Sequence, residues 1–188
     1  QAVVIGGGYI GLEVAASLTK LGLRVDVIEM ADRLLARVAS PQISAFFAEL
    51  HQSHDVGLQI GANCRKILQK GGAFTGVQLD DGRQITAGLL LVGIGVLPDL
   101  DLAASAGIEV GNGILVDAMM QSSVQDIFAI GDVALVDGAA SRVESVDNAQ
   151  MTAARAAAAI CGLAQPAMAA PWFWWEQFDV RLQSAGVV

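Results

Sequence analysis

Apolar runs and helical spacing alternate along the first part of the chain. A continuous apolar run predicts a buried strand at Ala2–Ile5, and apolar residues three and four positions apart predict a helix over Tyr9–Leu21. A second apolar run predicts a strand at Arg24–Ile28. The helix residues expected to face the sheet are Ile10, Val14, Leu18 and Leu21. A strand, a helix and a strand of this length close into a parallel unit with a right-handed crossover.

The next elements extend this sheet and then change its pattern. Ser40-Pro41 is typical of the start of a helix, which continues to about Ser53. A third strand is expected at Leu58–Ile60, followed by an antiparallel meander with a hairpin turn at Asp81-Gly82. The meander strands are Cys64–Gln69, Ala73–Leu79 and Arg83–Thr86, and the buried strand that returns is Leu89–Ile94.

Beyond Pro98 the elements become shorter. The pattern predicts a short helix at Leu100–Ala106 and an alanine-rich helix at Asn148–Ile160. A low-complexity linker is expected at Ala164–Pro171. The strands predicted in this part are Ile114–Val116 and Ile127–Ile130, and further strands are expected within Trp172–Gln183. The fold class is therefore α/β.

The composition agrees with a parallel sheet covered on both faces. Hydrophobic residues make up 54% of the chain and the mean hydropathy is +0.53. Buried parallel strands read as continuous apolar runs, which accounts for these values. The longest apolar run, Gly88–Pro98, is too short to span a bilayer. The net charge of −8 argues against a nucleic-acid surface, so neither nucleic acid nor membrane is an expected partner.

Neither the cysteines nor the histidines indicate a metal site. Cys64 and Cys161 lie far apart and form no close-spaced pair, so we expect two buried or semi-buried thiols in a reducing, cytoplasmic setting. His51 and His54 flank a helix end with no further ligands nearby, which favours two solvated surface histidines.

The strongest chemical signal is the glycine pattern between the first strand and the first helix. Gly6, Gly8 and Gly11 form G-x-G-x-x-G, with Tyr9 and Ile10 inside it. The first glycine allows a tight turn, the second lets a pyrophosphate approach the backbone, and the third lets the helix pack closely on the sheet. The helix N-terminus adds a partial positive charge for the phosphates. The pattern predicts a Rossmann-like dinucleotide-binding domain.

Glu29 indicates which dinucleotide is bound. It ends the second strand, where a carboxylate accepts hydrogen bonds from the hydroxyls of the adenosine ribose. A 2′-phosphate at that place would be repelled, so NAD(H) is favoured over NADP(H). The alternative is a glycine-rich turn in another doubly wound domain, in which the position of Glu29 is a coincidence.

Four further segments follow the glycine loop in a fixed order. The five segments are GGGYIGLE, LLLVGIGVLPD, IFAIGD, RVESVDNAQMTAARAAAAICG and PWFWWEQFDVRLQSAG. In this order the chain resembles the FAD-dependent pyridine nucleotide-disulfide oxidoreductases. It is most similar to their ferredoxin and rubredoxin reductase branch, which serves bacterial oxygenases.

This resemblance implies a domain arrangement. Residues 1–95 correspond to the NAD-binding domain, residues 96–165 to the second segment of the FAD-binding domain, and residues 166–188 to the start of an interface domain. The chain starts at Gln1 and stops in an apolar run, which favours a fragment that lacks the N-terminal FAD half. Such a fragment is expected to bind NAD without FAD and to be inactive alone.

The resemblance also implies roles for individual residues. Asp132 corresponds to the aspartate of the FAD ribityl chain, and Glu13 to the glutamate near the nicotinamide. Ile94 and Gly95 correspond to backbone beside the bound NAD, and Arg37 to a basic group near the adenosine phosphate. The residues that correspond to positions lining the flavin and nicotinamide are Glu144 and Trp174.

Each of these assignments has a structural alternative. Glu13 and Arg37 would be ordinary surface residues. The tryptophans Trp172, Trp174 and Trp175 would be core or interface aromatics. Relatives usually have a small polar residue where this chain has Trp175, so the local packing is expected to differ.

The implied activity is electron transfer from NADH through FAD to a ferredoxin or rubredoxin, an iron–sulfur carrier. No side chain is assigned as a catalytic acid or base. One alternative is an NADH oxidase, peroxidase or nitrite-reductase-type enzyme of the same superfamily, and another is a non-catalytic NAD-binding module. An unpaired edge at the predicted strand Ile127–Ile130 would favour a homodimer.

Overall fold

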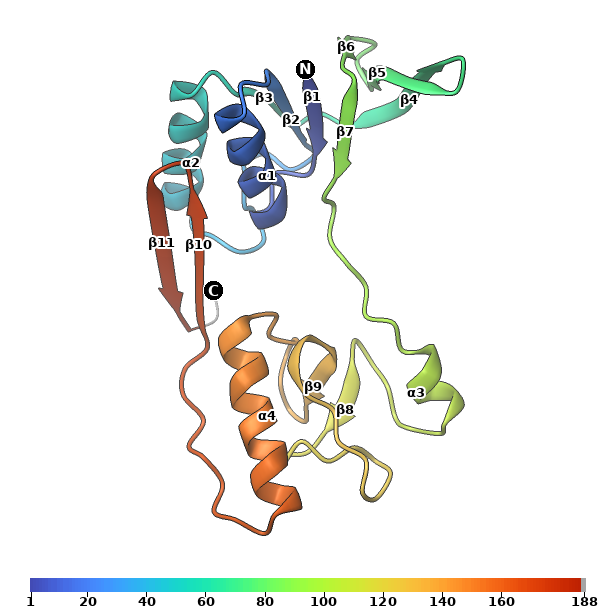
Figure 1. Ribbon diagram of the computed structural model, residues 1–188, viewed down its shortest axis with the longest axis vertical. Coiled ribbons are helices and arrows are strands. Elements are labelled where there is room, and N and C mark those ends of the chain that lie inside the picture. The colour runs from blue at the N-terminus through green and yellow to red at the C-terminus, as the bar shows by residue number, and fades with distance from the viewer. Residues whose placement is uncertain (187–188) are drawn as a thin grey trace. The chain divides into compact units, whose positions relative to one another are not determined.

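The computed structural model describes residues 1–186, so Val187 and Val188 of the proposed interface segment lie outside the described residues. The chain forms two compact units, which Figure 1 shows coloured by residue number. The first unit comprises residues 1–95 together with residues 175–182, and the second comprises residues 96–174 together with residues 183–186.

A parallel sheet of four strands forms the centre of the first unit (Figure 1). Its strand order is β3-β2-β1-β7, and every neighbouring pair is parallel. The strands are β1 (Ala2–Ile5), β2 (Val25–Glu29), β3 (Gly57–Ile60) and β7 (Leu89–Val92). The helices α1 (Tyr9–Lys20) and α2 (Pro41–Ser53) lie on one side of the sheet, and Ser40 caps α2 through its side chain. This arrangement confirms the predicted α/β class.

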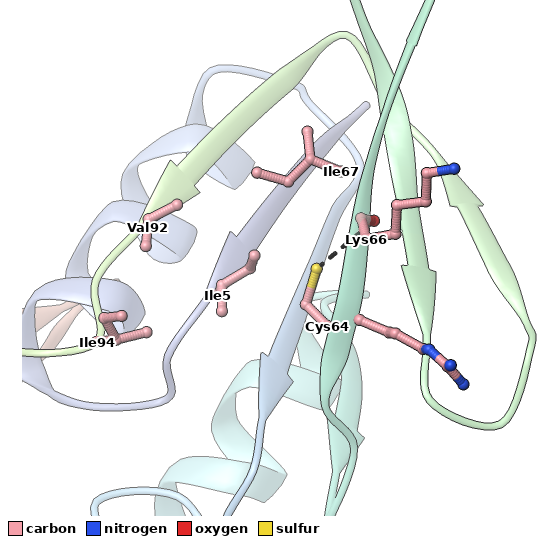
Figure 2. Close-up of a pocket in the computed structure, with 7 residues that line it drawn as sticks. Ile5, Cys64, Lys66, Ile67, Val92 and Ile94 are labelled. Carbon is pink, nitrogen blue, oxygen red and sulfur yellow. Dashed lines mark hydrogen bonds between the residues drawn. The ribbon is translucent and has the colours of Figure 1, made fainter.

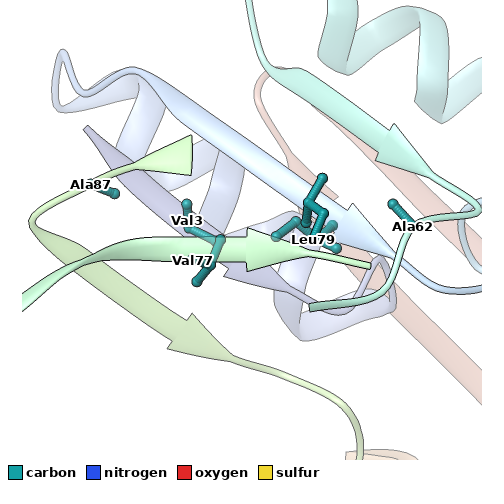
Figure 3. Close-up of a cluster of buried hydrophobic side chains, with 6 residues drawn as sticks. Val3, Ala62, Val77, Leu79 and Ala87 are labelled. Atoms are coloured by element: carbon teal, nitrogen blue, oxygen red, sulfur yellow. The ribbon is translucent and has the colours of Figure 1, made fainter. Parts of the chain in front are cut away.

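The antiparallel meander covers part of the sheet and completes a core. Its strands are β4 (Cys64–Lys70), β5 (Ala73–Leu79) and β6 (Gln84–Thr86). Figure 3 shows Val77 of β5 beside Val3 of β1, and Leu79 of β5 and Ile28 of β2 belong to the same buried cluster. The predicted meander is therefore confirmed, and it buries residues of the parallel sheet.

The face of α1 that meets the sheet differs from the prediction. The buried residues are Gly11, Leu12, Ala15 and Ala16, whereas Ile10 is 62% and Leu21 is 75% exposed. Val14 and Leu18 are only half-buried. Small residues allow the helix backbone to lie close to the strands. The helix therefore turns its small-residue face toward the sheet rather than the face with the larger apolar side chains.

The second unit contains short elements around its own core. Two parallel strands, β8 (Ile114–Val116) and β9 (Ala134–Val136), lie beside α4 (Val146–Ile160). The other elements are the short helix α3 (Asp101–Ser105) and the 3-10 turn η1 (Gly131–Val133).

The predicted strand Ile127–Ile130 is wrong. Phe128 makes an isolated bridge to Gln121, and the chain then turns at Gly131, whose φ of +66° is left-handed. Ile127 and Ile130 are exposed, whereas Ala129 is buried and Phe128 packs on the core of the second unit. The segment therefore contacts the core without the continuous ladder of a strand.

A hairpin of β10 (Trp172–Gln177) and β11 (Val180–Ala185) ends the described chain, and its tip belongs to the first unit. Within residues 1–186, no helix has both the length and the hydropathy needed to cross a membrane.

Candidate functional site

The glycine loop connects β1 to α1, and its backbone packs too tightly for side chains at two positions. Gly6 has a φ of +108°, and a Cβ placed on it would lie 2.2 Å from the carbonyl oxygen of Gly93. A Cβ on Gly11 would lie 1.9 Å from the carbonyl oxygen of Gly6. Such distances are impossible for carbon and oxygen, so the fold itself requires these two glycines.

Gly8 differs from its two neighbours in the motif. It is the N-cap of α1 with an extended backbone (φ −85°, ψ −173°), and a Cβ placed on it would meet no protein atom within 4 Å. The first turn of α1 carries no acidic side chain. An open backbone at a helix N-terminus is a binding surface for an anion such as a pyrophosphate.

The carboxylate of Glu29 is fixed beside this loop by two backbone amides. The amide of Gly7 donates to Oε2 at 2.6 Å, and the amide of Ala31 donates to Oε1 at 2.7 Å. A carboxylate has about four acceptor positions, so two remain for further donors such as ribose hydroxyls. The residue is half-buried.

The structure brings three other predicted residues to the end of β7. A Cβ on Gly95 would lie 3.5 Å from Nη2 of Arg37, so the guanidinium covers that part of the backbone. Ile94 is 68% exposed. Gly93 was not predicted as a site residue, although its amide donates to the carbonyl oxygen of Ile5 at 2.7 Å and its own carbonyl borders Gly6. The pair Gly93 and Gly95 on either side of Ile94 was the feature of the sequence that could have indicated Gly93 as a site residue.

A largely apolar groove of about 520 Å³ runs along the ends of β1 and β7 (Figure 2). Its lining residues are Ile5, Cys64, Arg65, Lys66, Ile67, Val92 and Ile94. Figure 2 shows Cys64 and Ile5 on the groove side, whereas the Lys66 side chain points away. Cys64 is half-buried as expected, but Cys161 is exposed, because it follows the last turn of α4.

Tyr9 and Glu13 lie one turn apart on α1, and both are partly buried. The hydroxyl of Tyr9 donates to the carbonyl oxygen of Val38 at 3.3 Å, and burial raises the pKa of Tyr9. Burial also raises the pKa of Glu13, an effect that the backbone amide of Glu176 opposes. Glu13 is therefore not on a fully solvated face.

The prediction of a solvated His51 is wrong. Its side chain is fully buried, and Nε2 lies 2.7 Å from Oε1 of Gln177. Phe178 contacts the His51 ring edge-on and stacks on His54 with ring centroids 3.8 Å apart. The covering residues come from the distant hairpin, which local sequence could not indicate. Within residues 1–186, no group of three or more His, Cys, Asp and Glu residues is arranged to hold a metal ion.

The burial of His51 predicts a stability that falls in acid. Burial lowers its pKa, and Nδ1 has no hydrogen-bond partner among the described residues, so protonation favours the unfolded chain. Between pH 7.5 and 5.5 the free energy of unfolding should fall by up to about 1.4 kcal/mol from this group. Urea unfolding of the chain and of His51→Gln at both pH values measures the difference. An identical loss in the two proteins would contradict the prediction.

In the second unit, Asp132 and Glu144 line one groove of about 340 Å³. Between them lies Arg142, which sequence reasoning did not single out. Its Nη1 pairs with Oε1 of Glu144 at 2.8 Å and donates to the carbonyl oxygen of Asp132. Its side chain is only 8% exposed, so this guanidinium fixes the positions of both predicted residues.

Trp174 lies apart from that groove lining. Its ring stacks on Trp172 with centroids 4.9 Å apart, and both residues are half-buried. The predicted site residues thus form two groups, one in each unit, and Trp174 belongs to neither groove.

Comparisons with known proteins identify the family of the chain. Residues 1–153 match the family described as pyridine nucleotide-disulphide oxidoreductase. The chain is 43% identical over 193 residues to a ferredoxin–NAD(P)⁺ reductase from Sphingomonas sp., an alignment that covers 100% of this chain and 47% of that protein. It is 40% identical over 192 residues to a rubredoxin–NAD⁺ reductase from Pseudomonas putida, with 100% of this chain and 50% of that protein covered.

A solved structure gives the same result. The reductase in the covalent putidaredoxin reductase–putidaredoxin complex superposes with a TM-score of 0.95 and is 39% identical, over 99% of this chain and 46% of that one. The chain therefore spans about half the length of the curated relatives it matches.

Proposed function

Because the chain belongs to the pyridine nucleotide-disulphide oxidoreductase family, we propose that it supplies the NADH-binding half of an FAD-dependent reductase. The electron acceptor would be an iron–sulfur carrier, a ferredoxin or a rubredoxin. One observation carries the nucleotide part of this proposal. Gly8 presents an open backbone at the N-terminus of α1, next to a carboxylate that two backbone amides hold in place.

Different residues of the first unit are assigned to different parts of the dinucleotide. Gly6, Gly8 and Gly11 shape the pyrophosphate site, and Tyr9 and Ile10 form the helix start beside it. Glu29 binds the adenosine ribose and favours NADH over NADPH by charge repulsion. The remaining contacts follow the family resemblance. Arg37 lies near the adenosine phosphate, Glu13 near the nicotinamide, and the backbone of Ile94 and Gly95 beside the bound NAD.

The second unit supplies groups for the flavin. Asp132 and Glu144 line one groove, which fits a polyol chain because a carboxylate accepts hydrogen bonds from hydroxyls. When bound, FAD accepts a hydride from the nicotinamide and releases electrons singly. The described residues contain one G-x-G-x-x-G loop, and it belongs to the NADH site. We therefore expect this chain to bind NADH and not to retain FAD.

The role assigned to the protein is to orient the two cofactors toward each other. Hydride transfer between two cofactors needs no side-chain acid or base, so no residue is given a catalytic role. Trp174 is proposed to line the flavin and nicotinamide region, on the family resemblance. The names of the relatives support a carrier reductase over an oxidase, a peroxidase, a nitrite reductase or a non-catalytic module. The cytoplasmic setting and the homodimer stay predictions. The homodimer was predicted from an unpaired edge of the strand Ile127–Ile130, which the structure does not contain.

Titration of the purified chain with NADH and with FAD tests the proposal. Calorimetry should show one NADH bound per chain, and gel filtration after incubation with FAD should give a colourless protein peak. A stoichiometric yellow protein would contradict the NAD-only part. Absence of any heat with NADH would overturn the nucleotide assignment itself.

A further inference from the structure

Trp175 is the buried centre of a contact between the hairpin tip and the helices of the first unit. Its side chain is 2% exposed. Its ring lies 4.4 Å from the Tyr9 ring, centroid to centroid, at an interplanar angle of 58°. Its ring also lies 5.4 Å from the ring of Phe47 of α2, at an interplanar angle of 32°. A residue more than 160 positions downstream of Tyr9 thus packs on that ring.

Tyr9 is the residue through which this contact reaches the nucleotide loop. It is the first residue of α1 and directly follows Gly8, the open position of the glycine motif. Its hydroxyl donates to the carbonyl oxygen of Val38, so the ring is held at its tip by that carbonyl and is packed against the tilted ring of Trp175. An aromatic side chain has two rotatable bonds, and these two contacts together restrict both.

Other residues of the hairpin tip extend the contact along α1. The backbone amide of Glu176 interacts with the Glu13 carboxylate, and Nζ of Lys20 donates to the carbonyl oxygen of Phe178. Tyr9, Glu13 and Lys20 follow helical spacing and lie on one face of α1. The hairpin tip therefore covers a continuous face of the helix that begins at the loop, and Trp175 lies at the loop end of that face.

We propose that Trp175 is a positioning residue of the nucleotide site. It holds the Tyr9 ring and the first turn of α1 in the arrangement that receives the pyrophosphate and nicotinamide half of NADH. This inference rests on the proposed function. A site ordered before binding loses less conformational freedom when the ligand arrives, so loss of the indole weakens NADH. AMP carries the adenine, the adenosine ribose and one phosphate but no nicotinamide half, so its binding depends on Glu29 and is affected little.

Calorimetric titration of Trp175→Ser with NADH and with AMP tests this inference. We expect the Kd for NADH to rise about fivefold and the Kd for AMP to stay within about twofold. Trp175→Phe keeps an aromatic ring against Tyr9 and should restore NADH binding to within about twofold of the original chain. Trp175→Leu replaces the serine variant if thermal unfolding shows that the serine variant does not fold.

Two controls separate positioning from core packing. Phe47→Leu removes a different aromatic contact of the indole and keeps the Tyr9 ring, so it should lower the unfolding temperature but leave NADH affinity unchanged. In a Tyr9→Leu background the ring on which Trp175 acts is gone, so Trp175→Ser should add no further loss of NADH affinity. Equal weakening of NADH and AMP, or additive losses in the double variant, would overturn the inference. If the unaltered chain did not bind NADH, the proposed function would fail instead.

Discussion

Alanine at position 11 is expected to abolish NADH binding and to lower the free energy of unfolding by about 2 kcal/mol or more. The added methyl would lie 1.9 Å from the carbonyl oxygen of Gly6 and 3.3 Å from Cγ1 of Val4, so the backbone must move. The gain of about 1 kcal/mol in helix propensity from glycine to alanine cannot offset this clash. Urea unfolding followed by circular dichroism measures the loss.

Gly8→Ala is the matched control for that experiment. The same substitution three residues earlier adds a methyl group that meets no protein atom within 4 Å. Its backbone conformation is open to any residue, so the free energy of unfolding should change by less than about 1 kcal/mol. Equal destabilisation by the two alanines would mean that the loop does not have the described backbone contacts.

Glu29→Ala is expected to weaken NADH binding about tenfold and to reduce the preference for NADH over NADPH by at least about tenfold. The substitution removes the proposed partner of the ribose hydroxyls and the charge that is expected to repel a 2′-phosphate. It also leaves the amides of Gly7 and Ala31 without their acceptor, so the loop loses order. Calorimetric titration with both cofactors gives the two affinities and their ratio.

Glu29→Gln separates these two effects. The amide side chain has the same length and retains one carbonyl acceptor for the loop, but it carries no charge. Discrimination against NADPH should fall as in the alanine variant, with a smaller loss of stability. An unchanged NADPH to NADH ratio in both variants would show that Glu29 does not face the ribose.

The sequence predicted the parallel sheet, the meander and the glycine loop because each depends on local signals. Strand Ala2–Ile5 and strand Ala73–Leu79 have the predicted bounds, and helix Pro41–Ser53 begins after the predicted cap at Ser40. Apolar runs, capping residues and glycine spacing act over a few residues, so they can be recognised in the sequence without knowledge of tertiary contacts.

The errors arose where distant contacts decide the outcome. His51 is buried because Gln177 and Phe178 pack on it, and no residue near His51 in sequence reveals this. The buried face of α1 follows from its close approach to the sheet at Gly11, Ala15 and Ala16 rather than from the size of its apolar side chains. Arg142 could not be predicted because its contacts with Asp132 and Glu144 exist only after the fold has brought these two residues to one groove.

The open backbone at Gly8 is proposed to receive the pyrophosphate of NADH. Side-by-side calorimetric titration of the original chain and of Gly8→Ala isolates this contact, because the added methyl touches no part of the protein. We expect one NADH per original chain and at least about tenfold weaker binding by the variant, at unchanged stability. Equal NADH affinity in the two proteins, or no binding by the original chain, would contradict it.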